Sequence, residues 1–254
     1  MRFFDTHSHL NFPQFDADLS EVIGRAKKNG VKEIVVVGTN RETISKALKI
    51  AHQYCLWASV GIHPSDAEKE RVEPRAFAEW LQNKRVVAIG ETGLDYASPV
   101  NKQRQEELFR FLLEKAKGAN LPAIIHSREA TVQTLKILKE FAPIKGVWHC
   151  FSGDEKLAKE ILDLGLFISF TANVTYQKNQ HLRDVVNFIP LESLLLETDC
   201  PFLPPEGRRG QRNEPAFLVR LAWVVAEIKR EPLLRVAEQT FKNGTVLFLA
   251  SKKE

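Results

Sequence analysis

Short apolar runs alternate with longer amphipathic segments along the whole chain. The short runs are rich in β-branched and aromatic residues, and some, such as Ile34–Val37 and Ala123–Ile125, contain no polar residue. Runs of this kind are typical of strands buried on both faces, as in a parallel sheet. They predict eight strands, at Arg2–Asp5, Glu33–Val37, Leu56–Val60, Val86–Ile89, Ala123–Ile125, Gly146–Trp148, Leu166–Ser169 and Leu194–Leu196.

The segments between these runs have the period of a helix with one buried face. In the first of them the apolar residues recur with the spacing i, i+3, i+4, i+7, at Leu19, Val22, Ile23 and Ala26. Gly30 is placed to end this helix. The same pattern predicts further helices at Ile44–Tyr54, Arg75–Gln82, Gln103–Ala119, Thr131–Phe141, Lys156–Leu164, Arg183–Phe188, Pro215–Lys229 and Leu233–Leu249.

This alternation predicts the α/β class and, more specifically, one (β/α)8 TIM barrel formed by a single domain over residues 1–254. Eight βα units in 254 residues average about 32 residues each, which fits this barrel. A doubly wound open sheet would show the same alternation, so periodicity alone leaves both architectures open.

Composition and charge change this picture little. The 36 Lys and Arg against 32 Asp and Glu give a net charge of +4, which permits an anionic partner without demanding one. No apolar run approaches the ~20 residues of a membrane span, and the first residues do not resemble a signal peptide, so we expect no membrane association. Three cysteines are too few for a disulfide framework and favour a cytoplasmic location.

Histidines and carboxylates follow the predicted strands at their carboxyl ends. In a barrel these ends converge on one mouth, where active sites of this fold lie, and such side chains are metal ligands by chemical type. His7 and His9 are two residues apart on an extended chain, so they share a face and can reach one ion. The segments concerned are Asp5-Thr6-His7-Ser8-His9, Gly61-Ile62-His63-Pro64, Gly90-Glu91-Thr92-Gly93-Leu94-Asp95, His126-Ser127-Arg128, His149-Cys150-Phe151-Ser152-Gly153 and Glu197-Thr198-Asp199-Cys200-Pro201.

Each of these residues alone also fits an ordinary structural role. His126 fits a buried histidine bonded to the backbone, Glu91 a helix cap, and Asp199 a turn residue. Their coincidence at one end favours a metal site, because several buried carboxylates together need a cation. Cys150 and Cys200 adjoin candidate ligands, but neighbours on a strand point to opposite faces, so we expect both to be packing residues.

Taken in order, these motifs and the segment Arg209–Pro215 resemble the TatD family of metal-dependent deoxyribonucleases. Each motif alone is modest, but the ordered set is specific and covers nearly the whole chain. The resemblance implies a (β/α)8 barrel of the amidohydrolase-like metal-dependent hydrolases, with two divalent cations per chain. Glu91 stands where related amidohydrolases often have a carboxylated lysine, which favours the TatD branch.

The resemblance also implies which residues bind the two ions. His7, His9 and Asp199 would hold one ion. His126 and His149 would hold the other, and Glu91 would bridge the two. A histidine-rich set suits Zn²⁺ or Mn²⁺, whereas nuclease chemistry often uses Mg²⁺, so the sequence does not choose among Zn, Mn and Mg.

The expected reaction is hydrolysis of DNA phosphodiester bonds by a water that the two ions activate. Glu91 and Asp199 would be catalytic, with Asp199 either taking the proton or acting as a ligand only. His63 would orient a phosphate or protonate the leaving oxygen, or it packs against the ligands. Arg128 and Arg212 are expected to bind substrate phosphates. The alternative is a solvated loop in which Arg212 pairs with Glu206 or Glu214. The neighbouring Arg208 and Arg209 fit phosphate contact and a solvated loop equally.

Two alternatives remain open at this point. The same centre would serve a hydrolase of another ester, such as the D-aminoacyl ester on tRNA, because the loops of a barrel decide its substrate. A non-catalytic metal-binding scaffold would be expected to have lost a ligand, and this chain keeps all six. No motif for reading bases is visible, so we expect DNA binding without sequence specificity. We also expect no obligate protein partner.

Overall fold

The structure of the chain is a computed structural model that describes residues 1–70 and 74–250. Residues 71–73 and 251–254 of the expected domain lie outside the described residues. Eight parallel strands form one sheet in which each strand pairs with the next along the chain. The strands are β1 (Phe3–Ser8), β2 (Val31–Val37), β3 (Trp57–Val60), β4 (Val86–Asp95), β5 (Ala123–Arg128), β6 (Gly146–Trp148), β7 (Phe167–Phe170) and β8 (Leu194–Leu196).

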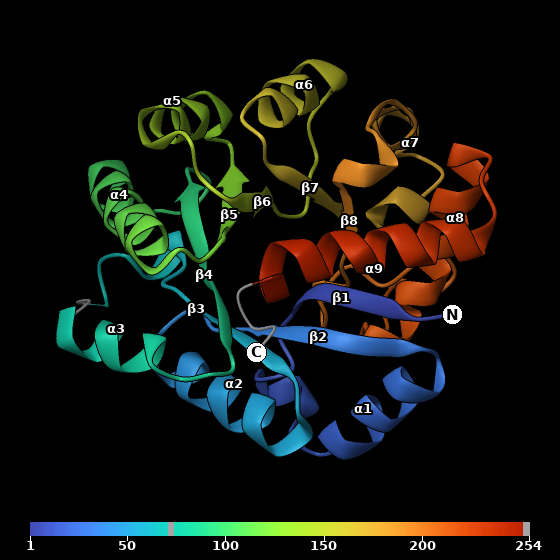
Figure 1. Cartoon of the computed structure of the whole chain (residues 1–254), viewed down its shortest axis with the longest axis horizontal. Coiled ribbons are helices and arrows are strands. Elements are labelled where there is room, and N and C mark those ends of the chain that lie inside the picture. Colours follow the sequence, from blue (N-terminus) through green and yellow to red (C-terminus); the bar gives the residue numbers. More distant parts are fainter. Residues whose placement is uncertain (71–73, 251–254) are drawn as a thin grey trace.

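Helices alternate with these strands and surround them (Figure 1). Their apolar faces pack on the outside of the sheet, and the polar faces point to solvent. In the described part of the chain the α-helices are α1 (Leu19–Lys28), α2 (Arg41–Tyr54), α3 (Pro74–Leu81), α4 (Lys102–Ala119), α5 (Thr131–Phe141), α6 (Glu155–Asp163), α7 (Gln180–Phe188), α8 (Leu218–Lys229) and α9 (Leu233–Leu249). None of them is long and apolar enough to cross a membrane.

The sheet nearly closes on itself where β1 meets the end of β8. The backbone N–H of Asp199 donates to His7 O (2.9 Å), and the N–H of His9 donates to Cys200 O (2.8 Å). The order β1 to β8 and this closure confirm the predicted (β/α)8 barrel over the doubly wound alternative, in which the strand order would reverse. The closing bonds also bring Asp199 beside His7 of β1 and beside His9, which directly follows that strand.

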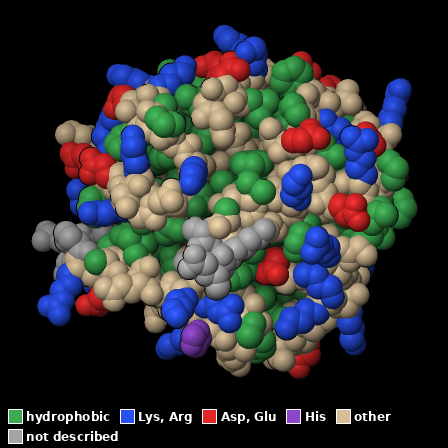
Figure 2. Space-filling model, viewed as in Figure 1, with side chains coloured by type: hydrophobic (Ala, Val, Ile, Leu, Met, Phe, Trp, Pro, Cys, Tyr) green, Lys and Arg blue, Asp and Glu red, His purple; other side chains and the backbone are tan. Residues whose placement is uncertain are grey.

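Helix α9 crosses the centre of the view in Figure 1, and it packs near the amino end of β1. Phe241 and Phe248 of this helix each pack against Phe4 of β1, with ring centroids 6.0 Å apart. With these rings in place, the amino end of the barrel is filled by apolar side chains. On the surface of this face, basic and acidic side chains are interspersed (Figure 2). Because apolar side chains fill the amino end, a site is expected at the carboxyl end of the barrel.

Three strands continue further than their apolar runs predict. β1, β4 and β5 end at Ser8, Asp95 and Arg128, so polar residues expected after the strands lie within them. Backbone pairing of β4 with β5 persists as far as Asp95 and Arg128. Gly93 allows this close approach, since it has a φ of +144° and a Cβ there would lie 1.9 Å from the carbonyl oxygen of His126.

Candidate metal centre

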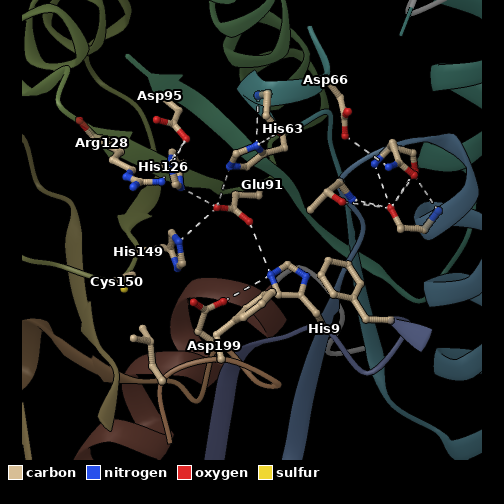
Figure 3. A pocket seen from close by; sticks show the side chains of 18 of the residues that line it. His9, His63, Asp66, Glu91, Asp95, His126, Arg128, His149, Cys150 and Asp199 are labelled. Carbon is tan, nitrogen blue, oxygen red and sulfur yellow. Dashed lines mark hydrogen bonds and ion pairs between the residues drawn. The ribbon is translucent and has the colours of Figure 1, made fainter. Parts of the chain in front are cut away.

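A cavity of about 720 Å³ opens at the carboxyl ends of the strands (Figure 3). Histidines and carboxylates from β4 and β5, and from the loops after β1, β3, β6 and β8, meet in it. The residues that line it are His9, Phe12, Thr39, Asn40, Thr43, His63, Ser65, Asp66, Glu91, Asp95, His126, Ser127, Arg128, His149, Cys150, Ser152, Asn173, Asp199, Phe202 and Leu203. The sequence prediction that these strand ends converge is thus confirmed.

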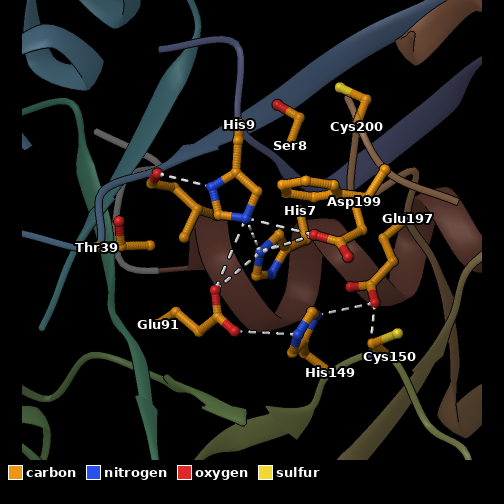
Figure 4. A network of polar contacts seen from close by, with 12 residues as sticks. His7, Ser8, His9, Thr39, Glu91, His149, Cys150, Glu197, Asp199 and Cys200 are labelled. Atoms are coloured by element: carbon orange, nitrogen blue, oxygen red, sulfur yellow. Dashed lines mark hydrogen bonds and ion pairs between the residues drawn. The ribbon is translucent and has the colours of Figure 1, made fainter. Parts of the chain in front are cut away.

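His7 and His9 present their Nε2 atoms to the same point. The two nitrogens lie 3.1 Å apart, and both side chains are buried. Nδ1 of His9 donates to the carbonyl oxygen of Val37 in β2 (3.3 Å), which leaves its Nε2 as an acceptor facing the centre. Oδ1 of Asp199 lies 3.6 Å from Nε2 of His7 and 3.3 Å from Nε2 of His9. These three residues form one side of the centre (Figure 4).

Glu91 lies between this side and a second pair of histidines. Its Oε1 is 2.8 Å from Nδ1 of His126 and 3.2 Å from Nε2 of His149. Its Oε2 is 3.4 Å from Nε2 of His7 and 3.8 Å from Nε2 of His9. One carboxylate therefore directs one oxygen to each pair of imidazoles (Figures 3 and 4).

The histidines keep both carboxylates of the centre ionised. Burial works against ionisation of Glu91, but the positive field of His149 and hydrogen bonds from the histidines outweigh it, so its pKa is well below the usual value. Burial likewise opposes ionisation of Asp199, and its contacts with the histidines, above all with His9, still lower its pKa. Ionised carboxylates carry acceptor oxygens only, as a metal ligand requires.

The donor set fits divalent cations. Groups of His, Asp and Glu ligand atoms within 4.8 Å of one another include His7, His9 and Glu91, and separately Glu91, His126 and His149. A further group of this kind is formed by His7, His149 and Asp199. Among the described residues, Nδ1 of His7 and Nε2 of His126 are buried without a hydrogen-bond partner. Buried imidazole and carboxylate atoms that converge in this way suit Zn²⁺, Mn²⁺ or Mg²⁺.

Glu197 bonds to the ligand candidate His149 without lining the cavity, and the sequence had given it no role. It is 1% exposed, and it accepts hydrogen bonds from Ser169 Oγ (2.7 Å) and from the backbone N–H of Cys150 (2.7 Å). Nδ1 of His149 donates to the same carboxylate (3.1 Å), which turns Nε2 toward Glu91. Such a partner fixes the ring and its tautomer. An acid directly after the apolar run Leu194–Leu196 was the available signal.

Replacing Glu197 with Gln is expected to weaken metal binding about 10- to 100-fold, because an amide cannot satisfy the three donors that the carboxylate satisfies. Metal affinity measured by calorimetry on the metal-stripped protein checks this. Glu192→Gln, an exposed position five residues earlier, is the matched control and should bind as the parent does. Parental affinity in Glu197→Gln would show that His149 is oriented by other contacts.

Asp199 does not sit on an extended strand end, contrary to the sequence expectation. β8 ends at Leu196, and Asp199 has a left-handed backbone with a φ of +52°. The turn is held by Asp5, whose carboxylate accepts from the N–H of Thr198 (2.9 Å) and from its Oγ1 (2.6 Å). Asn213, from the Arg209–Pro215 segment, donates to the carbonyl oxygen of Thr198 (2.9 Å). The turn still directs Asp199 into the centre.

The two cysteines beside ligands differ from each other. Cys200 is fully buried and packs in the core, as predicted. Cys150 was expected to pack as well, but its residue lines the cavity and has a left-handed φ of +48°. β6 ends at Trp148, and the chain turns at Cys150 instead of continuing as a strand. The alternation of side chains between the two faces of a strand therefore does not apply to Cys150.

His63 also lines the cavity, with Nε2 3.7 Å from Oε1 of Glu91. The backbone N–H of Ser65 donates to Nδ1 of His63 (3.1 Å), so the ring proton of the neutral form is on Nε2 and points to the centre. Burial lowers the pKa of His63 to about 4, against the opposing charge of Glu91. Asp95 is a further neighbour that the sequence analysis left without a role, 3.8 Å from Nε2 of His126.

The two arginines expected to bind phosphates lie in different surroundings. Arg128 lines the cavity with a side chain that is 66% exposed, and its Nη1 lies 4.0 Å from Asp95. Arg212 makes two hydrogen bonds of 2.7 Å to the carboxylate of Asp18 and does not line the cavity. The structure therefore places Arg128 at the site and gives Arg212 a structural ion pair instead.

The other two arginines of the loop after β8 also have partners in the protein. The guanidinium of Arg208 lies over the ring of Phe217, 4.5 Å from its centroid. That of Arg209 lies over the ring of Tyr176, at 5.1 Å. Cation–π contacts of this kind hold the loop against the barrel.

Residues 4–249 match the protein family described as TatD related DNase. The chain belongs to this family. The resemblance seen in the motifs is thereby confirmed, and this TatD-family chain is a metal-dependent hydrolase.

Individual relatives are similar to this chain over nearly their whole lengths. The chain is 43% identical to an uncharacterized metal-dependent hydrolase, YabD, of Bacillus subtilis, over 96% of this chain and 98% of the relative. It is 35% identical to the 3'-5' ssDNA/RNA exonuclease TatD of Erwinia amylovora, over 96% and 99%. The crystal structure of the TatD homologue YjjV of Escherichia coli superposes with a TM-score of 0.90 at 36% identity, over 97% of this chain and 98% of that one.

Proposed function

We propose that this TatD-family hydrolase holds two divalent cations and cleaves phosphodiester bonds in single-stranded nucleic acid, DNA above all. The position of Glu91 carries the proposal, because its two carboxylate oxygens each face a different pair of histidines. His7, His9 and Asp199 would hold one ion. His126 and His149 would hold the other ion, and Glu91 would contribute a carboxylate oxygen to each of the two.

Divalent ions bound here supply Lewis acidity, which promotes ionisation of water and stabilises charge on the phosphoryl oxygens. Asp199 takes the proton of the attacking water, since its carboxylate is ionised and lines the cavity. The water oxygen bonds to phosphorus as the bond from phosphorus to the leaving sugar oxygen breaks. That oxygen is protonated from solvent.

His63 and Arg128 position the substrate in this proposal. The N–H at Nε2 of His63 points into the cavity and donates to a phosphate oxygen. Arg128 stands at the exposed rim and pairs with a phosphate further along the strand. Arg212 has no part in it, because its guanidinium is engaged by Asp18.

Single-stranded nucleic acid is favoured by the relatives that carry the name 3'-5' ssDNA/RNA exonuclease. The cavity is also lined by aromatic and apolar residues beside its charged ones, which suits a substrate with exposed bases. A cytoplasmic location remains part of the proposal and rests on the free cysteines Cys55, Cys150 and Cys200.

The test is a substrate screen with metal-stripped protein reloaded with Mg²⁺, Mn²⁺ or Zn²⁺. We expect cleavage of single-stranded DNA that exceeds cleavage of duplex DNA and that a chelator abolishes. RNA and aminoacyl-tRNA are assayed in parallel. Release of an amino acid from aminoacyl-tRNA without cleavage of any nucleic acid would replace the phosphodiester assignment with ester hydrolysis.

A further inference from the structure

Two phenylalanine rings form one side of the cavity, and the proposed chemistry leaves them unused. Phe12 and Phe202, called the aromatic wall from here on, both line the cavity beside His9. The ring of Phe12 stacks on the imidazole of His9, with centroids 4.5 Å apart and planes 20° apart. The ring of Phe202 meets Phe12 edge-on, at 6.0 Å and 80°. The wall therefore begins in contact with a ligand of the centre.

Phe202 keeps its ring exposed although its backbone is fixed. The residue is 47% exposed, which is high for a phenyl ring at the mouth of a cavity. The N–H of Phe202 donates to the carbonyl oxygen of Asp199 (3.0 Å), and Asn213 donates to the carbonyl oxygen of Phe202 (2.7 Å). Both bonds fix the backbone that carries this exposed ring, three residues from the carboxylate proposed to be catalytic.

We infer that the aromatic wall is the stacking site for an unpaired nucleobase of a nucleotide adjoining the cleaved bond, an inference that rests on the proposed function. Phenyl rings stack on any base and form no hydrogen bond to its edge, so the wall accepts all four bases. The adjoining Leu203 also offers no hydrogen-bonding group in its side chain. A base within a duplex is already stacked and paired, and its removal costs free energy. The wall therefore selects for single strands without selecting for sequence.

The place of the wall leaves room for the rest of the strand. Phe12 and Phe202 also line a second hollow of about 690 Å³, so they stand as a partition between this hollow and the cavity. Thr43 lines both spaces as well. A base stacked on the partition thus lies at a boundary from which the polynucleotide continues outward.

The test compares the full-length, metal-loaded parent with Phe202→Ala on two kinds of single-stranded oligonucleotide. One kind carries all of its bases, and in the other a single nucleotide near the cleaved bond is abasic, one position at a time. We expect Phe202→Ala to lower kcat/KM on the intact strand about tenfold, mainly through KM. One abasic position should lower kcat/KM of the parent to a similar extent, and there Phe202→Ala should add no further loss.

Phe188→Ala is the matched control. Phe188 ends α7, is 44% exposed and does not line the cavity, so this variant should match the parent on both strands. Phe202→Trp should retain the parental kcat/KM, because indole also stacks. Circular dichroism and metal content check that each variant folds.

Two outcomes would overturn the inference alone while leaving phosphodiester cleavage intact. One is an unchanged kcat/KM in Phe202→Ala on the intact strand. The other is an equal loss on intact and on every abasic strand, which would make Phe202 a structural residue. A parent that cleaves no nucleic acid would overturn the proposed function and this inference together.

Discussion

Replacing Glu91 with Gln is expected to lower turnover on single-stranded DNA at least ~100-fold, which corresponds to about 3 kcal/mol of lost transition-state stabilisation. The substitution keeps the shape of the side chain but exchanges one acceptor oxygen for an NH₂ group. That group would face either the His7 and His9 pair or the His126 and His149 pair, both of which lie within 4 Å of the present carboxylate. One set of ligands then loses its shared anionic oxygen.

Metal analysis of the same variant distinguishes this cause from a general loss of structure. Glu91→Gln should retain fewer ions per chain than the parent after dialysis, with an unchanged circular dichroism spectrum. Glu238→Gln, an exposed position on α9, is the control and should match the parent in both assays. If Glu91→Gln binds ions and turns over as the parent does, Glu91 does not bridge.

The pair Asp199→Asn and Cys200→Ala should separate ligand from neighbour at the turn after β8. Asp199→Asn removes the negative charge beside His7 and His9 together with the proton acceptor, so turnover should fall at least ~100-fold. Cys200 is fully buried in the core and away from the cavity lining. Cys200→Ala should cost about 1 kcal/mol of unfolding free energy and leave turnover near the parental value.

Turnover and denaturant unfolding measured on both variants check this pair. An inactive Cys200→Ala together with an active Asp199→Asn would reverse the two roles. The ligand assignment and the description of the turn would then both be wrong at this position.

The hydrophobic pattern predicted the barrel well because most residues of the apolar runs are buried, whichever face of the sheet they are on. Runs such as Ile34–Val37 reflect that burial directly. The same pattern ended β4 at Ile89, whereas the strand continues to Asp95. Backbone pairing with β5, made possible by Gly93, extends the strand through polar residues. Hydrophobicity contains no information about such pairing.

The six proposed ligands were identifiable because the barrel brings every strand end to one mouth. Interactions that depend on loop conformation were not identifiable in this way. The left-handed turn at Asp199 depends on Asp5, far away in sequence, and the expectation of an extended chain there was wrong. Arg212 had a suitable charge for a phosphate, but its actual partner is Asp18, on another segment. Only the folded chain brings such partners together.

Titration of the metal-stripped protein with Mn²⁺ tests the central claim most directly, with bound ions and cleavage of single-stranded DNA measured on the same samples. The account predicts no cleavage without metal and a plateau of activity at two ions per chain, because Glu91 joins two ligand sets. A plateau at one ion would contradict the bridged centre. Undiminished cleavage in the metal-stripped protein, or none at saturation, would contradict metal-dependent phosphodiester hydrolysis itself.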